Sequence, residues 1–151
     1  MFNFFKKKNF FTEAETKQVV DAIQFAEQRT SGEVRVYVES RCRYMDPLDR
    51  AAEIFYMLDM KATKDRNAVL LYIAMKDRQL AIFGDEGIHK KVGSEYWSNE
   101  VRLMINKFDT ENYGEGISQC VKDIGESLHQ HFPFDSKGDK NELPDEIVFG
   151  K

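Results

Sequence analysis

The feature that most constrains the fold is an apolar run at residues 68–75, AVLLYIAM. A strand that is apolar almost throughout suits the centre of a sheet that is covered on both faces. Residues 33–40, EVRVYVES, alternate instead and place their valines on one face, which predicts a second strand. A helical pattern at residues 46–58 separates the two strands. We therefore expect a crossover unit with parallel strands and a right-handed connection.

Helix-start signals support this organisation. Thr12 and Glu15 form a capping box, and the apolar spacing that follows predicts a first helix running to about Arg29. Asp46 and Pro47 suit the N-cap and first position of the next helix.

The second half of the chain completes the pattern. Residues 79–84, QLAIFG, predict a third strand that returns antiparallel after the short turn KDR. Apolar stripes predict helices at 94–108 and at 112–128, the latter with a capping pair that starts at Asn112. Residues 145–151, DEIVFGK, suit a short edge strand. The order α-β-α-β-β-α-α predicts an α/β protein, a three-layer α/β/α sandwich around a small mixed sheet.

Composition excludes several classes of protein. With 42% hydrophobic and 32% charged residues the chain has an ordinary globular composition, and a net charge of −4 gives no broad footprint for nucleic acid. No apolar run approaches the roughly 20 residues of a transmembrane segment. The two cysteines, Cys42 and Cys120, fit no paired motif, so we expect reduced thiols in a cytoplasmic protein. We also expect a monomer.

The N-terminal residues 1–11, MFNFFKKKNFF, lack the pattern of a secretory signal. Their lysines and phenylalanines leave two interpretations open. One is a weak peripheral contact with a membrane surface. The other is a terminus whose phenylalanines pack on the sandwich.

The predicted topology brings two polar loops to one edge of the sheet. The third strand runs opposite to the second, so its end lies beside the beginning of residues 68–75. The loop at 61–67, KATKDRN, should therefore lie next to residues 84–87, GDEG.

These loops are rich in carboxylates. Asp65 should lie near Asp85 and Glu86, and Asp59, just past the preceding helix, should be able to approach them. A divalent cation relieves the repulsion among such groups, and their hard oxygen ligands suit one or two Ca²⁺ or Mg²⁺ ions. The alternative is a solvated turn in which the glycines supply positive φ. A phosphate cradle is disfavoured because GDEG matches neither a Walker loop nor a dinucleotide fingerprint, and its two carboxylates would repel a phosphate unless a metal came between them.

A second acidic group is expected at the opposite edge. Asp46 is already explained there as a helix cap, and Asp77 as a turn residue. The members of this group are Asp46, Asp49, Asp77, Asp109 and Glu111.

Four ordered segments resemble those of TPM-domain proteins. They are TSGEVRVYVES at 30–40, DRNAVLLYIAMKDRQLAIFGDEGIHKKVG at 65–93, EYW at 95–97 and FDTENYGEGI at 108–117. The resemblance covers roughly residues 12–132. It implies an N-terminal extension at 1–11, a TPM domain at 12–132 and a C-terminal tail at 133–151.

The resemblance implies the sandwich fold derived above. Plant members of the family lie in the thylakoid lumen, are linked to photosystem II repair and have been assigned acid phosphatase activity. Some members resemble divalent-cation binders. Many bacterial members carry a signal peptide and a membrane anchor, and this sequence shows neither, so it resembles a stand-alone TPM domain.

The family's residues carry over unevenly. Many members have Asp-Asn-Gly before the second strand, where this chain has the segment Asp65-Arg66-Asn67-Ala68, so an acid is present but displaced. Many have Gly-Asp-Tyr before the last helix, where this chain has Asn112 before Tyr113. The lost aspartate weakens the transfer of phosphatase activity.

The sequence therefore predicts a stand-alone TPM domain that binds Ca²⁺ or Mg²⁺ through Asp65, Asp85, Glu86 and Asp59. The binding module would be regulated by metal and would contact an unknown protein partner. Two alternatives stay open. One is a metal-assisted phosphomonoesterase, for which no dedicated nucleophile is visible, and the other is a metal-free interaction scaffold.

Overall fold

The computed structural model describes residues 10–134 and 147–150. The chain order of its elements alternates helices and strands at first and ends with a helical half. The elements are α1 (Glu13–Glu27), β1 (Glu33–Glu39), α2 (Pro47–Met57), β2 (Ala68–Ala74), β3 (Gln79–Gly84), α3 (Glu86–Val92), α4 (Ser94–Phe108), α5 (Tyr113–His131) and β4 (Val148–Phe149).

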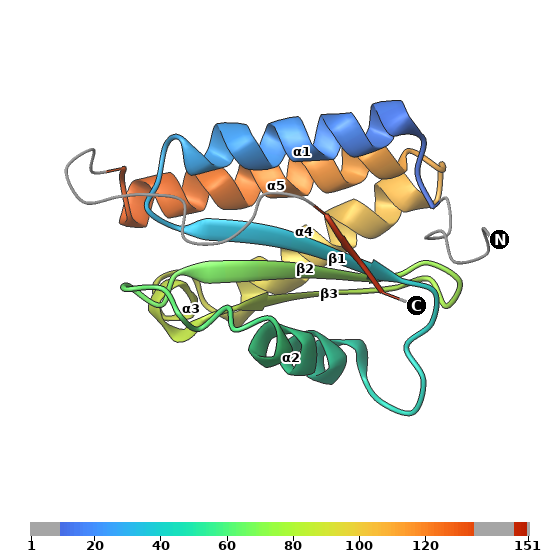
Figure 1. Ribbon diagram of the computed structural model, residues 1–151, viewed down its shortest axis with the longest axis horizontal. Coiled ribbons are helices and arrows are strands. Elements are labelled where there is room, and N and C mark those ends of the chain that lie inside the picture. Colours follow the sequence, from blue (N-terminus) through green and yellow to red (C-terminus); the bar gives the residue numbers. More distant parts are fainter. Residues whose placement is uncertain (1–9, 135–146, 151) are drawn as a thin grey trace, which may run out of the picture.

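The sheet has the order β3-β2-β1-β4. β1 is parallel to β2, and β3 returns antiparallel to β2, as predicted. β4 adds to the free side of β1 in parallel, with Val38 opposite Phe149, which confirms the predicted edge strand. In Figure 1, α2 covers one face of the sheet alone, while α1, α4 and α5 cover the other. The three-layer α/β/α sandwich is confirmed.

The residues of β1 alternate between apolar and polar, yet both faces of the strand are buried. All seven residues of β1 are buried, because α2 also covers the face that carries the polar side chains. Glu39 on this face accepts hydrogen bonds from Arg50 of α2 and from the Tyr72 hydroxyl of β2. Burial and the hydrogen bond to Glu39 raise the pKa of Tyr72. The polar face is therefore a buried network and not a solvated surface.

The predicted helix starts at Thr12, Asp46 and Asn112 are confirmed, but only the first two carry the expected capping hydrogen bond. Thr12 and Glu15 form both hydrogen bonds of the capping box, at 3.0 and 2.8 Å. Asp46 accepts from the Leu48 N–H at the start of α2. Asn112 makes no capping bond, because its side-chain amide donates to the Thr110 hydroxyl instead.

The short helix α3 was not predicted. It has seven residues and only Ile88 is buried, so it shows no repeating apolar stripe. Its start is set by Asp85, whose carboxylate accepts from the Glu86 N–H at 2.8 Å. Basic side chains in its last turn complement the helix dipole.

The described part of the N-terminus packs on the sandwich. The ring of Phe10 stacks on Phe149 of β4 at 6.5 Å between centroids, and Phe11 contacts Tyr113 and Phe149. The membrane interpretation of the N-terminus falls mainly on residues 1–9, which lie outside the described residues. Within residues 10–134 and 147–150, every helix is too short or too polar to cross a bilayer.

Candidate functional site

The structure brings the two predicted acidic loops together at the α3 end of the sheet (Figure 1). The Gly87 N–H donates to the carbonyl of Arg66 at 2.8 Å, and the Asp85 N–H donates to the carbonyl of Ala68 at 2.9 Å. A Cβ atom on Gly87 would lie 2.1 Å from the carbonyl oxygen of Asp65. Only glycine allows so close an approach between the two backbones.

Asp85 lies at the centre of this contact and is 2% exposed. Its two carboxylate oxygens accept from Nε and Nη2 of Arg66 at 2.6 and 2.8 Å, a bidentate pair. Glu86 is more exposed, and one of its oxygens lies 3.6 Å from Nη1 of the same arginine. Hydrogen bonding to Asp85 raises the pKa of the Arg66 guanidinium, so this side chain is a permanent cation.

The other two predicted ligands are not bonded to this pair. Asp65 and Asp59 are exposed, and Asp59 has a left-handed backbone with φ of 56° just past α2. Within the described residues, no hydrogen bond or ion pair joins either side chain to Asp85.

The donor set does not fit a metal ion while Arg66 is in place. Both oxygens of Asp85 already accept hydrogen bonds. Nowhere in the described ranges do three or more His, Cys, Asp or Glu side chains converge as metal ligands would. An ion could use Asp85 only after Arg66 had moved away.

Arg66 is the residue of this site whose role the sequence did not reveal. Its partner follows 19 positions later, beyond two strands, so no local spacing marks the pair. The available signal was a basic residue inside an acidic loop, KDRN.

His89 has a structural role beside the acidic loops. The indole N–H of Trp97 donates to its Nδ1 at 3.0 Å, which connects α3 to α4. The indole ring of Trp97 also covers Gly84, where an added Cβ atom would lie 2.3 Å from this ring. This end of the sheet is therefore tightly packed.

The acidic group expected at the opposite edge is dispersed. Asp46 caps α2, and Asp77 accepts from Arg41 at 3.0 Å and from the Cys42 N–H at 2.7 Å. Both interpretations from the sequence, cap and turn residue, are confirmed. Asp109 instead lines a small pocket under the junction of α4 and α5.

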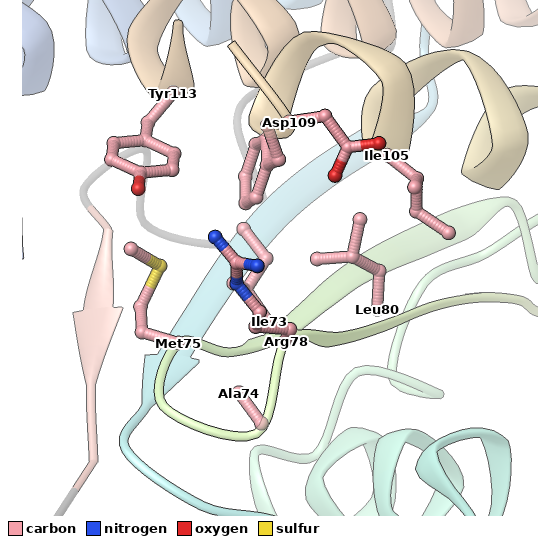
Figure 2. A pocket seen from close by; sticks show the side chains of 9 residues that line it. Ile73, Ala74, Met75, Arg78, Leu80, Ile105, Asp109 and Tyr113 are labelled. Atoms are coloured by element: carbon pink, nitrogen blue, oxygen red, sulfur yellow. The ribbon is translucent and has the colours of Figure 1, made fainter. Parts of the chain in front are cut away.

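That pocket has polar groups around an apolar floor. Figure 2 shows the Arg78 guanidinium rising from the β2–β3 turn, with the side chains of Tyr113 and Asp109 above it and Leu80 and Ile105 to one side. Its volume of about 50 Å³ admits only a few water molecules. It is too small for an organic ligand.

A buried acid that the sequence did not reveal lies between α4 and α5. Glu100 is 7% exposed and borders a cavity of about 260 Å³ together with Cys120 and Asp123. Burial, reinforced by the neighbouring Asp123, raises the pKa of Glu100 to about 8. Burial also raises the pKa of the Cys120 thiol. An acidic residue on an amphipathic helix ordinarily predicts a solvated position, so nothing in the sequence marks Glu100 as buried.

Comparison with known proteins identifies the class. The TPM domain family model matches residues 5–127, so the chain belongs to the TPM-domain family. The chain is similar to the BA42 protein of the psychrophilic bacterium Bizionia argentinensis, known from an NMR structure. The two share 37% identity and a TM-score of 0.85 over 93% of this chain and 96% of that one. No curated protein matches the sequence.

More distant structures share the fold alone. The N-terminal domain of a P. gingivalis protein is 18% identical with a TM-score of 0.69, covering 83% of each chain. The N-terminal domain of the cg2496 protein from Corynebacterium glutamicum is 12% identical with a TM-score of 0.59, covering 85% of this chain and 84% of that one.

Proposed function

We propose that this TPM domain is a binding module whose acidic loops take up one divalent cation, Ca²⁺ or Mg²⁺, in exchange for the Arg66 guanidinium. One observation carries the proposal: the carboxylates of Asp85 and Glu86 share a single arginine as their ion-pair partner within the described residues. Arg66 thus occupies the position that an external cation would take.

The charges of the loops support an exchange. Asp65, Asp85 and Glu86 lie within the two adjoining loops, and Arg66 neutralises only part of their charge. Exposed Lys61 and Lys64 reduce the negative potential further without entering an ion pair in the described part of the chain. We therefore expect weak binding, in the millimolar range typical of sites with few fixed ligands.

Arg66 is also able to leave. Its side chain is 35% exposed, so the guanidinium can turn into water and be hydrated there. Asp85 is fixed as the N-cap of α3 and stays in place when the arginine moves. Released in this way, the Asp85 oxygens and the exposed carboxylates of Glu86 and Asp65 form an oxygen-rich surface of the kind Ca²⁺ and Mg²⁺ prefer. Asp59 is the ligand with the least structural support.

The test is a Ca²⁺ and Mg²⁺ titration of metal-stripped protein, followed by residue-resolved NMR. We expect saturable shifts at Asp65, Asp85 and Glu86. Arg66→Gln removes the competing cation and should tighten binding at least tenfold. Arg66→Lys keeps the charge but loses the bidentate geometry. The affinity of this variant for the cation should therefore fall between that of the parent protein and that of Arg66→Gln.

Arg78→Gln is the matched control, because Arg78 also has a left-handed backbone in a loop, at the other end of the sheet. It should leave the titration unchanged. The double variant Asp85→Asn/Glu86→Gln should abolish the shifts. Unchanged binding in that variant, or no shifts with millimolar metal in Arg66→Gln, would refute the proposal and favour the metal-free scaffold.

The phosphomonoesterase alternative would use the same loops. Against it, the thiols of Cys42 and Cys120 are both buried and thus poorly placed as nucleophiles. If the chain is nevertheless an enzyme, it should hydrolyse an aryl phosphate only with metal present, and Asp65→Asn should lower the rate. Activity that survives this substitution would come from another site or from a contaminant.

A further inference from the structure

A separate hollow lies at the opposite end of the sheet, beside the carboxyl ends of the parallel strands β1 and β2. Its volume is about 440 Å³, within the range of small-molecule sites. Figure 1 shows this end of the sheet, where the chain leaves β1 towards α2. Carboxyl ends of parallel strands are the usual place for ligands in α/β proteins. The residues that line it are Glu39, Ser40, Arg41, Arg43, Met45, Arg50 and Lys76.

Two of its basic side chains are already paired. Arg50 donates to both oxygens of Glu39, at 3.0 Å each, and Arg41 donates to Asp77 at 3.0 Å. These pairs hold their guanidinium groups at the wall of the hollow. The carboxylate of Asp46 is also engaged, at the cap of α2.

The other two basic side chains have no such partner. Arg43 and Lys76 are exposed, and neither makes an ion pair with any residue that the structure describes. Arg50 also pairs with Glu53, so the positive charges of the hollow that no ion pair in the described residues engages are those of Arg43 and Lys76. This is a local property, because the whole chain has a net charge of −4.

Ser40 adds a buried donor to the same wall. It is 6% exposed, and within the described ranges its hydroxyl has no hydrogen-bond partner. Buried hydroxyls normally have one, so an unpaired hydroxyl beside a hollow points to a ligand. The backbone here is fixed, because the Lys76 N–H donates to the Ser40 carbonyl at 2.8 Å and the Met75 N–H donates to that of Glu39 at 2.9 Å.

We propose that this hollow binds a small, doubly charged oxyanion, such as an organic phosphate or a dicarboxylate. Arg43 and Lys76 supply the two opposite charges, and the Ser40 hydroxyl donates a hydrogen bond to one oxygen. Arg41 and Arg50 keep their acidic partners and shape the wall. A small ligand fits better than a polymer, because the hollow holds about 440 Å³ and the chain as a whole has a net charge of −4. The proposal is independent of cation binding at the acidic loops.

The test is an NMR titration of the full chain at low ionic strength with two probes, glycerol 3-phosphate and succinate. Potassium chloride at matched ionic strength is the third arm. We expect saturable shifts of the amides of Ser40, Arg43 and Lys76 with at least one of the dianions and none that saturate with chloride. A preference for glycerol 3-phosphate identifies a phosphate head group, and a preference for succinate identifies a dicarboxylate.

Variants separate a built site from general charge attraction. Arg43→Gln/Lys76→Gln should weaken binding of the preferred probe at least tenfold. Arg102→Gln/Lys122→Gln removes the same charge from exposed helix positions and should leave binding unchanged. Ser40→Ala should weaken binding by about three- to tenfold, in line with one lost hydrogen bond. Equal affinity in both double variants, or shifts no different from those with chloride, would overturn the proposal.

Discussion

The two ends of the sheet treat charge in opposite ways. At the α3 end, Asp85 is buried and paired with Arg66, and Gly87 packs directly on the backbone of the neighbouring loop. At the other end, Arg43 and Lys76 keep exposed charges around an open hollow. A charge that the chain pairs internally contributes to the fold, whereas an unpaired charge at a hollow stays available for a ligand. The predictions below test this difference.

The largest effect is expected at the packed end. Gly87→Ala places a methyl group against the carbonyl oxygens of Asp65 and Arg66, at 2.1 and 2.6 Å. Because backbone atoms cannot move aside as side chains do, we expect a loss of about 3 kcal/mol or more in the free energy of unfolding. Urea unfolding followed by circular dichroism measures it.

Lys90→Ala on the same short helix is the control, since Lys90 is exposed. It should change stability by less than about 0.5 kcal/mol. If the two variants unfold alike, the close approach at Gly87 does not hold the loops together.

Glu100 shows what happens to a buried carboxylate that, unlike Asp85, has no arginine. Its pKa of about 8 in the folded protein lies above the ordinary value of 4.5, so between these pH values the folded state holds a proton that the unfolded state has lost. The contribution of Glu100 to the free energy of unfolding is therefore fully present below pH 4.5 and is lost as the pH rises towards 8. The slope is at most about 1.4 kcal/mol per pH unit.

Glu100→Gln should remove this slope and be more stable than the parent protein at pH 8. Urea unfolding at pH 5, 6, 7 and 8 measures the difference. Glu86→Gln, which changes an exposed carboxylate at the packed end, should keep the parent's slope. Parallel pH curves for Glu100→Gln and the parent would show that Glu100 is ionised in the folded state.

A smaller loss is expected for Asp85→Ala. It removes the cap of α3, which costs about 1 kcal/mol, while the partly exposed Arg66 can be hydrated once it is free. Asp85→Asn keeps a good capping side chain and should lose less. Thermal unfolding compares the two, and a larger loss in the asparagine variant would contradict the capping role.

The smallest effect belongs to the open end. Arg43→Gln/Lys76→Gln should change stability by less than about 0.5 kcal/mol, because neither side chain has an ion-pair partner among the described residues. Differential scanning calorimetry without added anions measures it. A clear loss of stability would mean that these charges serve the fold, and the contrast between the two ends would fail.

The sheet and its layers followed from the sequence because strand patterns are repeated signals. The apolar run of β2 and the valines of β1 each specify a covered strand, and the helix between them fixes their parallel pairing. The short α3 carries no repeat, so it was missed. Asn112 was correctly placed at the N-cap of α5, but the contact of its side chain with Thr110 in place of a capping bond cannot be weighed from spacing alone.

The candidate sites were less predictable for a physical reason. The topology placed the loop of Asp65 beside Asp85, yet it could not show that Arg66 turns inward from a backbone with φ of 52° to neutralise Asp85. The hollow at the carboxyl ends of β1 and β2 is lined by residues from the end of β1 and the loop after it, from α2 and from the turn after β2. Such a convergence depends on side-chain directions, and the sequence does not encode these as a local pattern.

The pairing of β4 with β1 has a consequence for the protein as it is made. The Gly150 N–H donates to the carbonyl of Val38 at 2.7 Å, so this edge of β1 is completed by a segment that leaves the ribosome after α5. Until then the nascent chain presents unpaired backbone donors and acceptors along β1, a template for association with other chains. Loss of residues 147–150 would therefore leave the rest of the sandwich in place and yet make the molecule prone to self-association.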